Sequence, residues 1–306
     1  MAEKTPPGFK SFWDRVDDDL AHIPIAAETE HIPMRSTDKY DLYGVRITSV
    51  GPYRLFGYLS IPKTHETLPA IYYVPKNGSV HEIIPQGTAV AVREHYVTFS
   101  LACRGMRNSD RPYAAMYPGQ LTDGLESAES YVYRGIAADT IRGLEYMITR
   151  PEIDKNRITA WGNDNALLVA ARRKQITHVI TQPAYLFDTI NNSAKTTSYP
   201  LAEFSDYLRL HPKRTRQVAE ILEMYNLRWH APYITAKTLV RANHSEGIYG
   251  PNVLSEMYEH IVGKVTVHES EQSSFKDGLF AEKWLTQEML GSKATPIVPE
   301  HWQAFV

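Results

Sequence analysis

The residues that best fit catalytic chemistry in this chain lie in one short turn. Residues 162–166 have the sequence GNDNA and fall between an apolar run at 157–161 and a helical pattern that begins at Leu167. A strand, a sharp turn of small residues and a helix form the setting of a nucleophile elbow, whose usual pattern is G-x-S-x-G. Gly162 is kept here, but Asp164 occupies the serine position. A serine nucleophile is therefore excluded at this place.

Alternating strands and helices are expected to position this turn. Strands are expected at 43–47, 55–59, 69–74, 96–101, 157–161, 177–181, 237–241 and 264–267, and helices at 11–23, 89–94, 134–149, 167–173, 251–262 and 277–290. The first two strands flank Gly51-Pro52, which predicts an antiparallel hairpin. Strands that alternate with helices predict a mostly parallel sheet covered on both faces. We expect one α/β domain over residues 1–306, with a mostly helical insertion at 183–232.

Composition excludes several classes of function. The formal net charge of the 306 residues is −2, so the chain has no basic footprint for nucleic acid. The single cysteine, Cys103, excludes an internal disulfide and fits a reducing compartment. The first residues contain no apolar signal segment, and no run of eighteen apolar residues occurs. We therefore expect a soluble cytoplasmic protein with neither nucleic acid nor membrane as a partner.

Several segments, taken in order, resemble a known family. They are GYLSIP at 57–62, Arg104-Gly105, YPG at 117–119, YVYR at 131–134 and the helical stretch 200–211. With them the chain resembles, from about Phe12 to Leu290, the acetyl xylan esterase and cephalosporin C deacetylase family. The resemblance implies an α/β-hydrolase fold, an acetylated small-molecule substrate and no cofactor. It also implies a homo-oligomer, because the family forms hexamers.

The family's Ser-His-Asp triad falls on altered residues in this chain. The nucleophile position is Asp164, the acid position is Glu246, and the histidine position falls on or next to Ser273. The nearest histidine is His268, five residues upstream. The tyrosine that the family places at an oxyanion turn is Lys76 here. The resemblance thus implies Asp164, Lys76, Glu246 and Ser273 as site residues, with the backbone N–H groups of Lys76 and Asn165 facing an acyl oxygen.

A serine triad needs an alcohol, a base and an acid that orients the base, and this chain lacks the first two. Three hypotheses remain. In the leading one, Asp164 projects into the pocket as a general base, and proton abstraction beside a carbonyl expels acetate, with Lys76 stabilising the anion. In the second, Asp164 is itself the nucleophile of a hydrolase. In the third, the chain is a catalytically inactive scaffold or binding protein.

Four further residues are candidates for the wall of the pocket. The aromatic residues Tyr117 and Tyr131 lie in a loop that could overhang it, Arg104 opens that loop, and His268 could swing toward the vacant base position. No metal site is expected, because the segment HEIIP at 81–85 lacks the second histidine of H-E-x-x-H.

Overall fold

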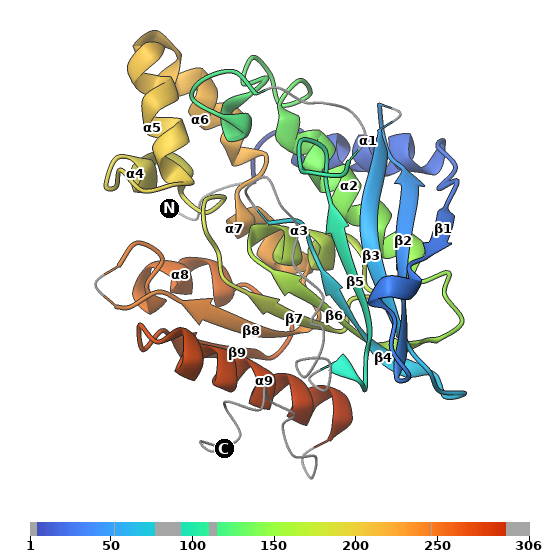
Figure 1. Cartoon of the computed structure of the whole chain (residues 1–306). Coiled ribbons are helices and arrows are strands. Elements are labelled where there is room, and N and C mark those ends of the chain that lie inside the picture. The colour runs from blue at the N-terminus through green and yellow to red at the C-terminus, as the bar shows by residue number, and fades with distance from the viewer. Residues whose placement is uncertain (1–4, 52, 77–92, 110–114, 246, 292–306) are drawn as a thin grey trace.

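The computed structural model describes residues 5–51, 53–76, 93–109, 115–245 and 247–291. Within these residues one nine-stranded sheet has the order β1-β2-β3-β5-β4-β6-β7-β8-β9. The strands β1, β2, β3 and β5 pair antiparallel, and the remaining neighbours pair parallel. The expected α/β-hydrolase architecture, with a mostly parallel central sheet and helices on both faces, is therefore confirmed (Figure 1).

The strands are β1 Glu28–His31, β2 Tyr40–Thr48, β3 Arg54–Pro62, β4 Leu68–Tyr73, β5 Val97–Ala102, β6 Ile153–Gly162, β7 His178–Thr181, β8 Lys237–Ala242 and β9 Val265–Glu269. The α-helices are α1 Phe9–Ala21, α2 Val132–Met147, α3 Asp164–Arg172, α4 Thr189–Ser193, α5 Leu201–Leu210, α6 Thr215–Glu223, α7 Leu227–His230, α8 Pro251–Tyr258 and α9 Ser274–Leu290. Short 3-10 helices cover Pro33–Arg35, Gln120–Thr122, Pro212–Arg214 and Ala231–Tyr233.

Most of the elements expected from the sequence are present. The antiparallel hairpin is β2 and β3, and all eight expected strands occur with ends at most four residues from the predicted ones. The edge strand β1 is missed because its four residues are all exposed and carry no apolar alternation. Residues 89–92 of the helix expected at 89–94 lie outside the described residues.

The two faces of the sheet bury two separate cores. Alternate side chains of β4 divide between them: Ala70 and Tyr72 face the larger core, whereas Ile71 and Tyr73 face the smaller one. The larger core lies under α1, α2, α3 and α8, and the smaller one lies under α9, where Leu285 is fully buried (Figure 1). Because both faces of β4 are buried in this way, residues can reach solvent only beyond the end of the strand.

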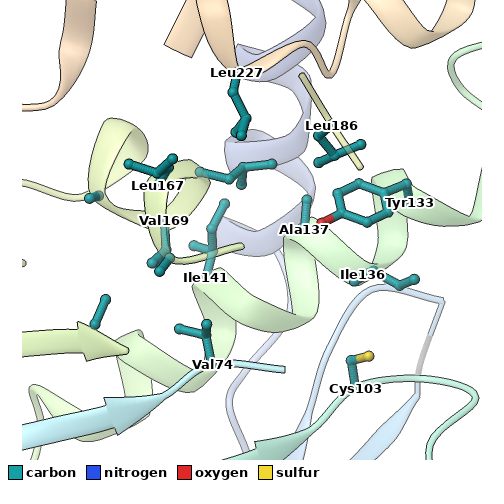
Figure 2. Packing of buried hydrophobic residues seen from close by; sticks show 14 of the residues in the cluster. Val74, Cys103, Tyr133, Ile136, Ala137, Ile141, Leu167, Val169, Leu186 and Leu227 are labelled. Carbon is teal, nitrogen blue, oxygen red and sulfur yellow. The ribbon is translucent and has the colours of Figure 1, made fainter. Parts of the chain in front are cut away.

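The helices α2 and α3 hold the turn of interest between them and the sheet. In Figure 2, Ile141 of α2, Val169 of α3 and Val74 at the end of β4 fill the space behind the turn. Leu186 and Leu227, from the segments that follow β7, pack against the same cluster.

The expected insertion at 183–232 contains the helices α4 to α7; one 3-10 helix lies between α5 and α6, and another follows α7. Its helix α6 is amphipathic and buries Val218, Ile221 and Leu222. Among the described residues, no helix is both long enough and apolar enough to cross a bilayer.

Candidate active site

A cavity of about 450 Å³ opens at the carboxyl edge of the parallel strands β4, β6, β7 and β8. This is the edge where open α/β sheets bind their ligands. Its lining residues come from the strand ends, from the insertion and from the loop after β8: Lys76, Trp161, Gly162, Asn163, Gln182, Pro183, Ala184, Thr196, Ser198, Tyr199, Pro200, Leu201, Arg241, Asn243, Ile248 and Tyr249. The cavity therefore lies where the sequence predicts the active site.

The turn after β6 does not have the strained backbone of a nucleophile elbow. None of residues 162–166 has a positive φ, and Asn163 lies at φ −110° and ψ −131°. Asp164 is already the first residue of α3, three residues earlier than the predicted helix start. Gly162 is required by packing, since a Cβ atom there would lie 2.3 Å from Cγ2 of Val74. The turn keeps the close strand contact of an elbow but not the strained residue that would present a side chain to a pocket.

Asp164 does not project into the cavity, and this corrects the leading expectation. It is absent from the lining residues and is completely buried. Its carboxylate accepts hydrogen bonds from the backbone N–H groups of Ala184 (3.0 Å), Tyr185 (3.3 Å) and Leu186 (2.8 Å). The side chain thus fastens the segment after β7 to the start of α3. A carboxylate enclosed in this way has no access to a substrate as base or nucleophile.

Burial also changes the ionisation of this carboxyl group. Burial raises the pKa of Asp164 from 3.8 to about 6, although the hydrogen bonds from Leu186, Tyr185 and Ala184 act in the opposite direction. At neutral pH the group is mostly ionised, and its charge is stabilised by backbone dipoles.

Lys76 lines the cavity as expected, but it does so without Asp164 as a facing anion. The other cation of the lining is Arg241, the fifth residue of β8. Among the described lining residues there is no histidine, aspartate or glutamate. The walls instead offer amide groups, hydroxyl groups and the aromatic rings of Trp161, Tyr199 and Tyr249. This set can bind a polar or anionic compound by hydrogen bonds and charge.

The comparison with protein families decides the relationship of this chain. The family model of acetyl xylan esterase (AXE1) matches residues 1–280. The chain belongs to the acetyl xylan esterase family. The acetyl esterase Axe7A of Xylanibacter ruminicola is 19% identical to it over 287 residues, which cover 87% of this chain and 64% of that relative. The chain thus spans less than two thirds of that relative's length.

Solved structures of family members share the fold. The acetyl xylan esterase of Paenibacillus sp. R4 superposes with a TM-score of 0.79 at 18% identity, covering 93% of this chain and 96% of the other. Acetyl xylan esterase 1 of Thermoanaerobacterium sp. JW/SL YS485 gives 0.76 at 19% identity, covering 90% and 92%. At these identities the likeness establishes the fold alone.

Three of the expected site residues are structural in this member of the family. Asn165 is buried in the first turn of α3, where its side chain accepts from the Tyr133 hydroxyl (2.5 Å) and donates to the Pro75 carbonyl (2.8 Å). Arg104 forms an ion pair with buried Asp139 (2.8 Å). Tyr131 is also buried, and its hydroxyl donates to the carbonyl of Leu121 (2.8 Å). None of these three residues lines the cavity, so the expected placement of Arg104 and Tyr131 on its wall is corrected.

The residues expected near the histidine position do not form a base. Ser273 is the N-cap of α9 and accepts from the N–H of Lys276 (3.3 Å). His268 lies under α9, where Nε2 is 2.8 Å from Oδ1 of Asp277 and the ring stacks on Phe280 with centroids 4.2 Å apart. Neither residue lines the cavity, so the placement of His268 as a candidate for the pocket wall is corrected.

Two further candidates are resolved differently. Tyr117 is 65% exposed, and its hydroxyl accepts from Arg209 (3.1 Å), so it does not overhang the cavity. Glu246, the expected acid, lies outside the described residues. No group of three or more His, Cys, Asp or Glu side chains suited to a metal ion occurs within the ranges that the structure describes.

Sequence reasoning missed Gln182, Arg241 and Asn243. Gln182 directly follows β7, and Asn243 directly follows β8, so both stand at carboxyl ends of parallel strands. That position is itself a signal for a ligand-binding residue. Arg241 was harder to find, because an arginine inside a buried strand is more often an element of packing or an ion pair.

Proposed function

We propose that this chain is a ligand-binding member of the acetyl xylan esterase family that does not use a Ser-His-Asp triad. The ligand is a small acylated, sugar-like compound, bound in the cavity at the carboxyl edge of β4, β6, β7 and β8. The observation that carries the proposal is the position of Asp164. Asp164, which the resemblance places at the family's nucleophile position, accepts hydrogen bonds from three backbone N–H groups and is absent from the cavity wall.

The chemistry of the cavity supports binding over cleavage. General acid–base catalysis needs a titratable side chain within hydrogen-bond reach of the substrate. The described lining residues supply Lys76 and Arg241 as cations but no carboxylate and no imidazole. Elimination of acetate with Asp164 as base has no support in this geometry, and neither does an ester intermediate on Asp164.

The polar groups of the walls fit a polyhydroxylated ligand. Gln182 and Asn243 stand at neighbouring strand ends, and their side chains contact each other with Nε2 of Gln182 3.4 Å from Oδ1 of Asn243. Asn243 is held in turn by donating to the carbonyl of Ile248. Amide groups held by the protein can bind hydroxyl groups with little loss of side-chain entropy. The cavity volume lies in the range of small-molecule sites.

Acetate release and binding should be measured together. The probes are p-nitrophenyl acetate and methyl β-D-xyloside triacetate, with calorimetry for binding and an acetate assay for cleavage. We expect the xyloside to bind and acetate to appear no faster than without protein, in both wild type and Asp164→Asn. Acetate release by wild type that Asp164→Asn abolishes would refute the proposal and restore Asp164 as a catalytic group.

Hydrolysis of acetyl esters is the second candidate function, and the family match over residues 1–280 favours it. In that case acetate is released by wild type and by Asp164→Asn at equal rates, because groups other than Asp164 then carry the reaction. Substitution Lys76→Met in the cavity wall should lower the rate. The two proposals are therefore separated by one set of assays.

A further inference from the structure

Arg241 differs from the other enclosed arginines of this protein. The buried or half-buried guanidinium groups of Arg93, Arg104, Arg142, Arg134, Arg172 and Arg228 each have a carboxylate within 3.0 Å. Arg241 forms neither an ion pair nor a hydrogen bond within the described part of the chain, and its Nε atom is buried without an acceptor. Four of the others, Arg134, Arg142, Arg172 and Arg228, also leave Nε without an acceptor, but each of these four guanidinium groups forms an ion pair with a carboxylate.

The carboxylate that acts on the charge of Arg241, that of Asp277, already has other hydrogen-bond partners. Asp277 favours the charged form of Arg241, while burial has the larger effect and lowers the pKa of the guanidinium. The carboxylate of Asp277 accepts from Nε2 of His268 (2.8 Å), the hydroxyl of Ser270 (2.6 Å) and the N–H of Glu271 (3.0 Å). Asp277 therefore accepts hydrogen bonds from these three groups and none from Arg241.

A partly enclosed cation without a partner costs stability, because burial removes hydration that nothing replaces. Arg241 lines the cavity, as does Lys76, and the described lining contains no carboxylate. A planar guanidinium presents a fork of N–H donors that matches the oxygen atoms of a carboxylate or phosphate. The missing partner of Arg241 is thus supplied most simply by a ligand that enters the cavity.

We infer that the cavity binds a monosaccharide that carries an oxyanion, and that Arg241 is the residue that binds this oxyanion. The inference rests on the proposed function and narrows its ligand class. Lys76 adds a second positive charge to the wall, and Trp161 and Tyr199 provide aromatic surface for a sugar ring. The oxyanion is a carboxylate, as in a uronic acid, or a phosphate.

Calorimetry with three probes tests the inference: D-glucuronate, D-glucose 6-phosphate and D-glucose. At least one of the two acidic sugars should bind ~10-fold or more tightly than glucose, since a hydrogen bond to a charged group contributes that much. The acidic sugar that binds more tightly identifies the oxyanion. Equal binding of glucose and both acidic sugars, or no binding of any of them, would overturn the inference.

Two variants make the test specific. Arg241→Gln should remove the preference for the acidic sugar, and it should unfold at the same temperature as wild type or higher, because an unpaired cation is lost. Arg216→Gln removes the same charge from a side chain that is 92% exposed on α6, and it should bind like wild type. A preference that survives Arg241→Gln, or a lower unfolding temperature of that variant, contradicts the inference.

The proposed function can fail independently of this inference. If the xyloside triacetate binds without acetate release and acidic sugars are not preferred, the proposed binding function stands and only the inference of an oxyanion fails. If an acidic sugar binds tightly and acetate is also released, the inference about Arg241 stands and only the proposal of a non-catalytic function fails.

Discussion

Asp164 should make this protein more stable as the pH falls from 8 to 5, relative to a variant that cannot titrate at that position. The perturbation is Asp164→Asn, which keeps the size of the side chain and removes its ionisation. In the native state burial raises the pKa of Asp164 to about 6, whereas its ordinary value is 3.8. The folded protein therefore binds a proton at this site more tightly than the unfolded chain does.

The sign and size follow from this difference. A raised native-state pKa contributes stability that is fully present below about 3.8 and is lost as the pH rises through about 6. Between these two values each pH unit corresponds to about 1.4 kcal/mol. We compare the free energy of unfolding of wild type with that of Asp164→Asn. At pH 5, one unit below the native pKa, this difference should favour wild type by about 1.4 kcal/mol more than it does at pH 8.

The assay is urea-induced unfolding of both proteins at half-unit steps between pH 5 and pH 8. Asp154→Asn is the matched control. Its hydrogen bonds with Arg157 and with the N–H of Asn156 lower the pKa of Asp154, so that carboxyl group is ionised throughout the window. The difference between wild type and Asp154→Asn should therefore not depend on pH.

A flat difference between wild type and Asp164→Asn would refute the burial of this carboxyl group. A solvent-facing Asp164, as a base in the cavity requires, has a native pKa close to its ordinary value and predicts such a flat result. An increase with pH would contradict the sign of the reasoning. The experiment therefore reports on the feature that separates the binding function from the catalytic hypotheses.

Three further outcomes are expected. Gly162→Ala should lower the free energy of unfolding by about 1–3 kcal/mol, because its Cβ meets Val74 at 2.3 Å. In urea unfolding, the double variant Gly162→Ala with Val74→Ala should lose less free energy of unfolding than the two single variants lose together. Glu282→Gln should destabilise by about 3–5 kcal/mol, because it removes the carboxylate that forms an ion pair with buried Arg93 (2.7 Å). Arg93→Met combined with it should recover part of the loss in thermal unfolding. Asp164→Ser should release no acetate from p-nitrophenyl acetate, since the side chain faces the 184–186 backbone and not the cavity; esterase activity in this variant would show that the turn can open.

Much of the fold could be predicted because its signals are local. The apolar runs at β4, β6, β7 and β8 are short and bounded by turn residues, which is the pattern of buried parallel strands. The hairpin of β2 and β3 follows from alternation on both sides of Gly51. The exposed strand β1 carries no such signal and is defined only by its pairing with β2.

The position of the cavity was also predictable, but the identity of most of its walls was not. A motif places Asp164 at the right strand end, yet its side chain could in principle face either the cavity or the segment after β7. Three N–H donors from residues 184–186 decide this, and they are twenty or more positions away in the sequence. His268 is likewise drawn under α9 by Asp277, nine residues later.

From the residues alone we predict that Asp164 stands at the family's nucleophile position and that Ser273 stands at or next to its histidine position, because residue identity can be read without coordinates. The sequence by itself also determined the order of strands and helices, since periodicity and turn residues are local properties of the chain. Which side chains reach the cavity could not be predicted in this way and depends on packing between distant segments. Side-chain direction depends on which distant donors and acceptors come within hydrogen-bond distance, and it is packing between elements that brings Asp164 to the backbone and leaves Arg241 at the cavity.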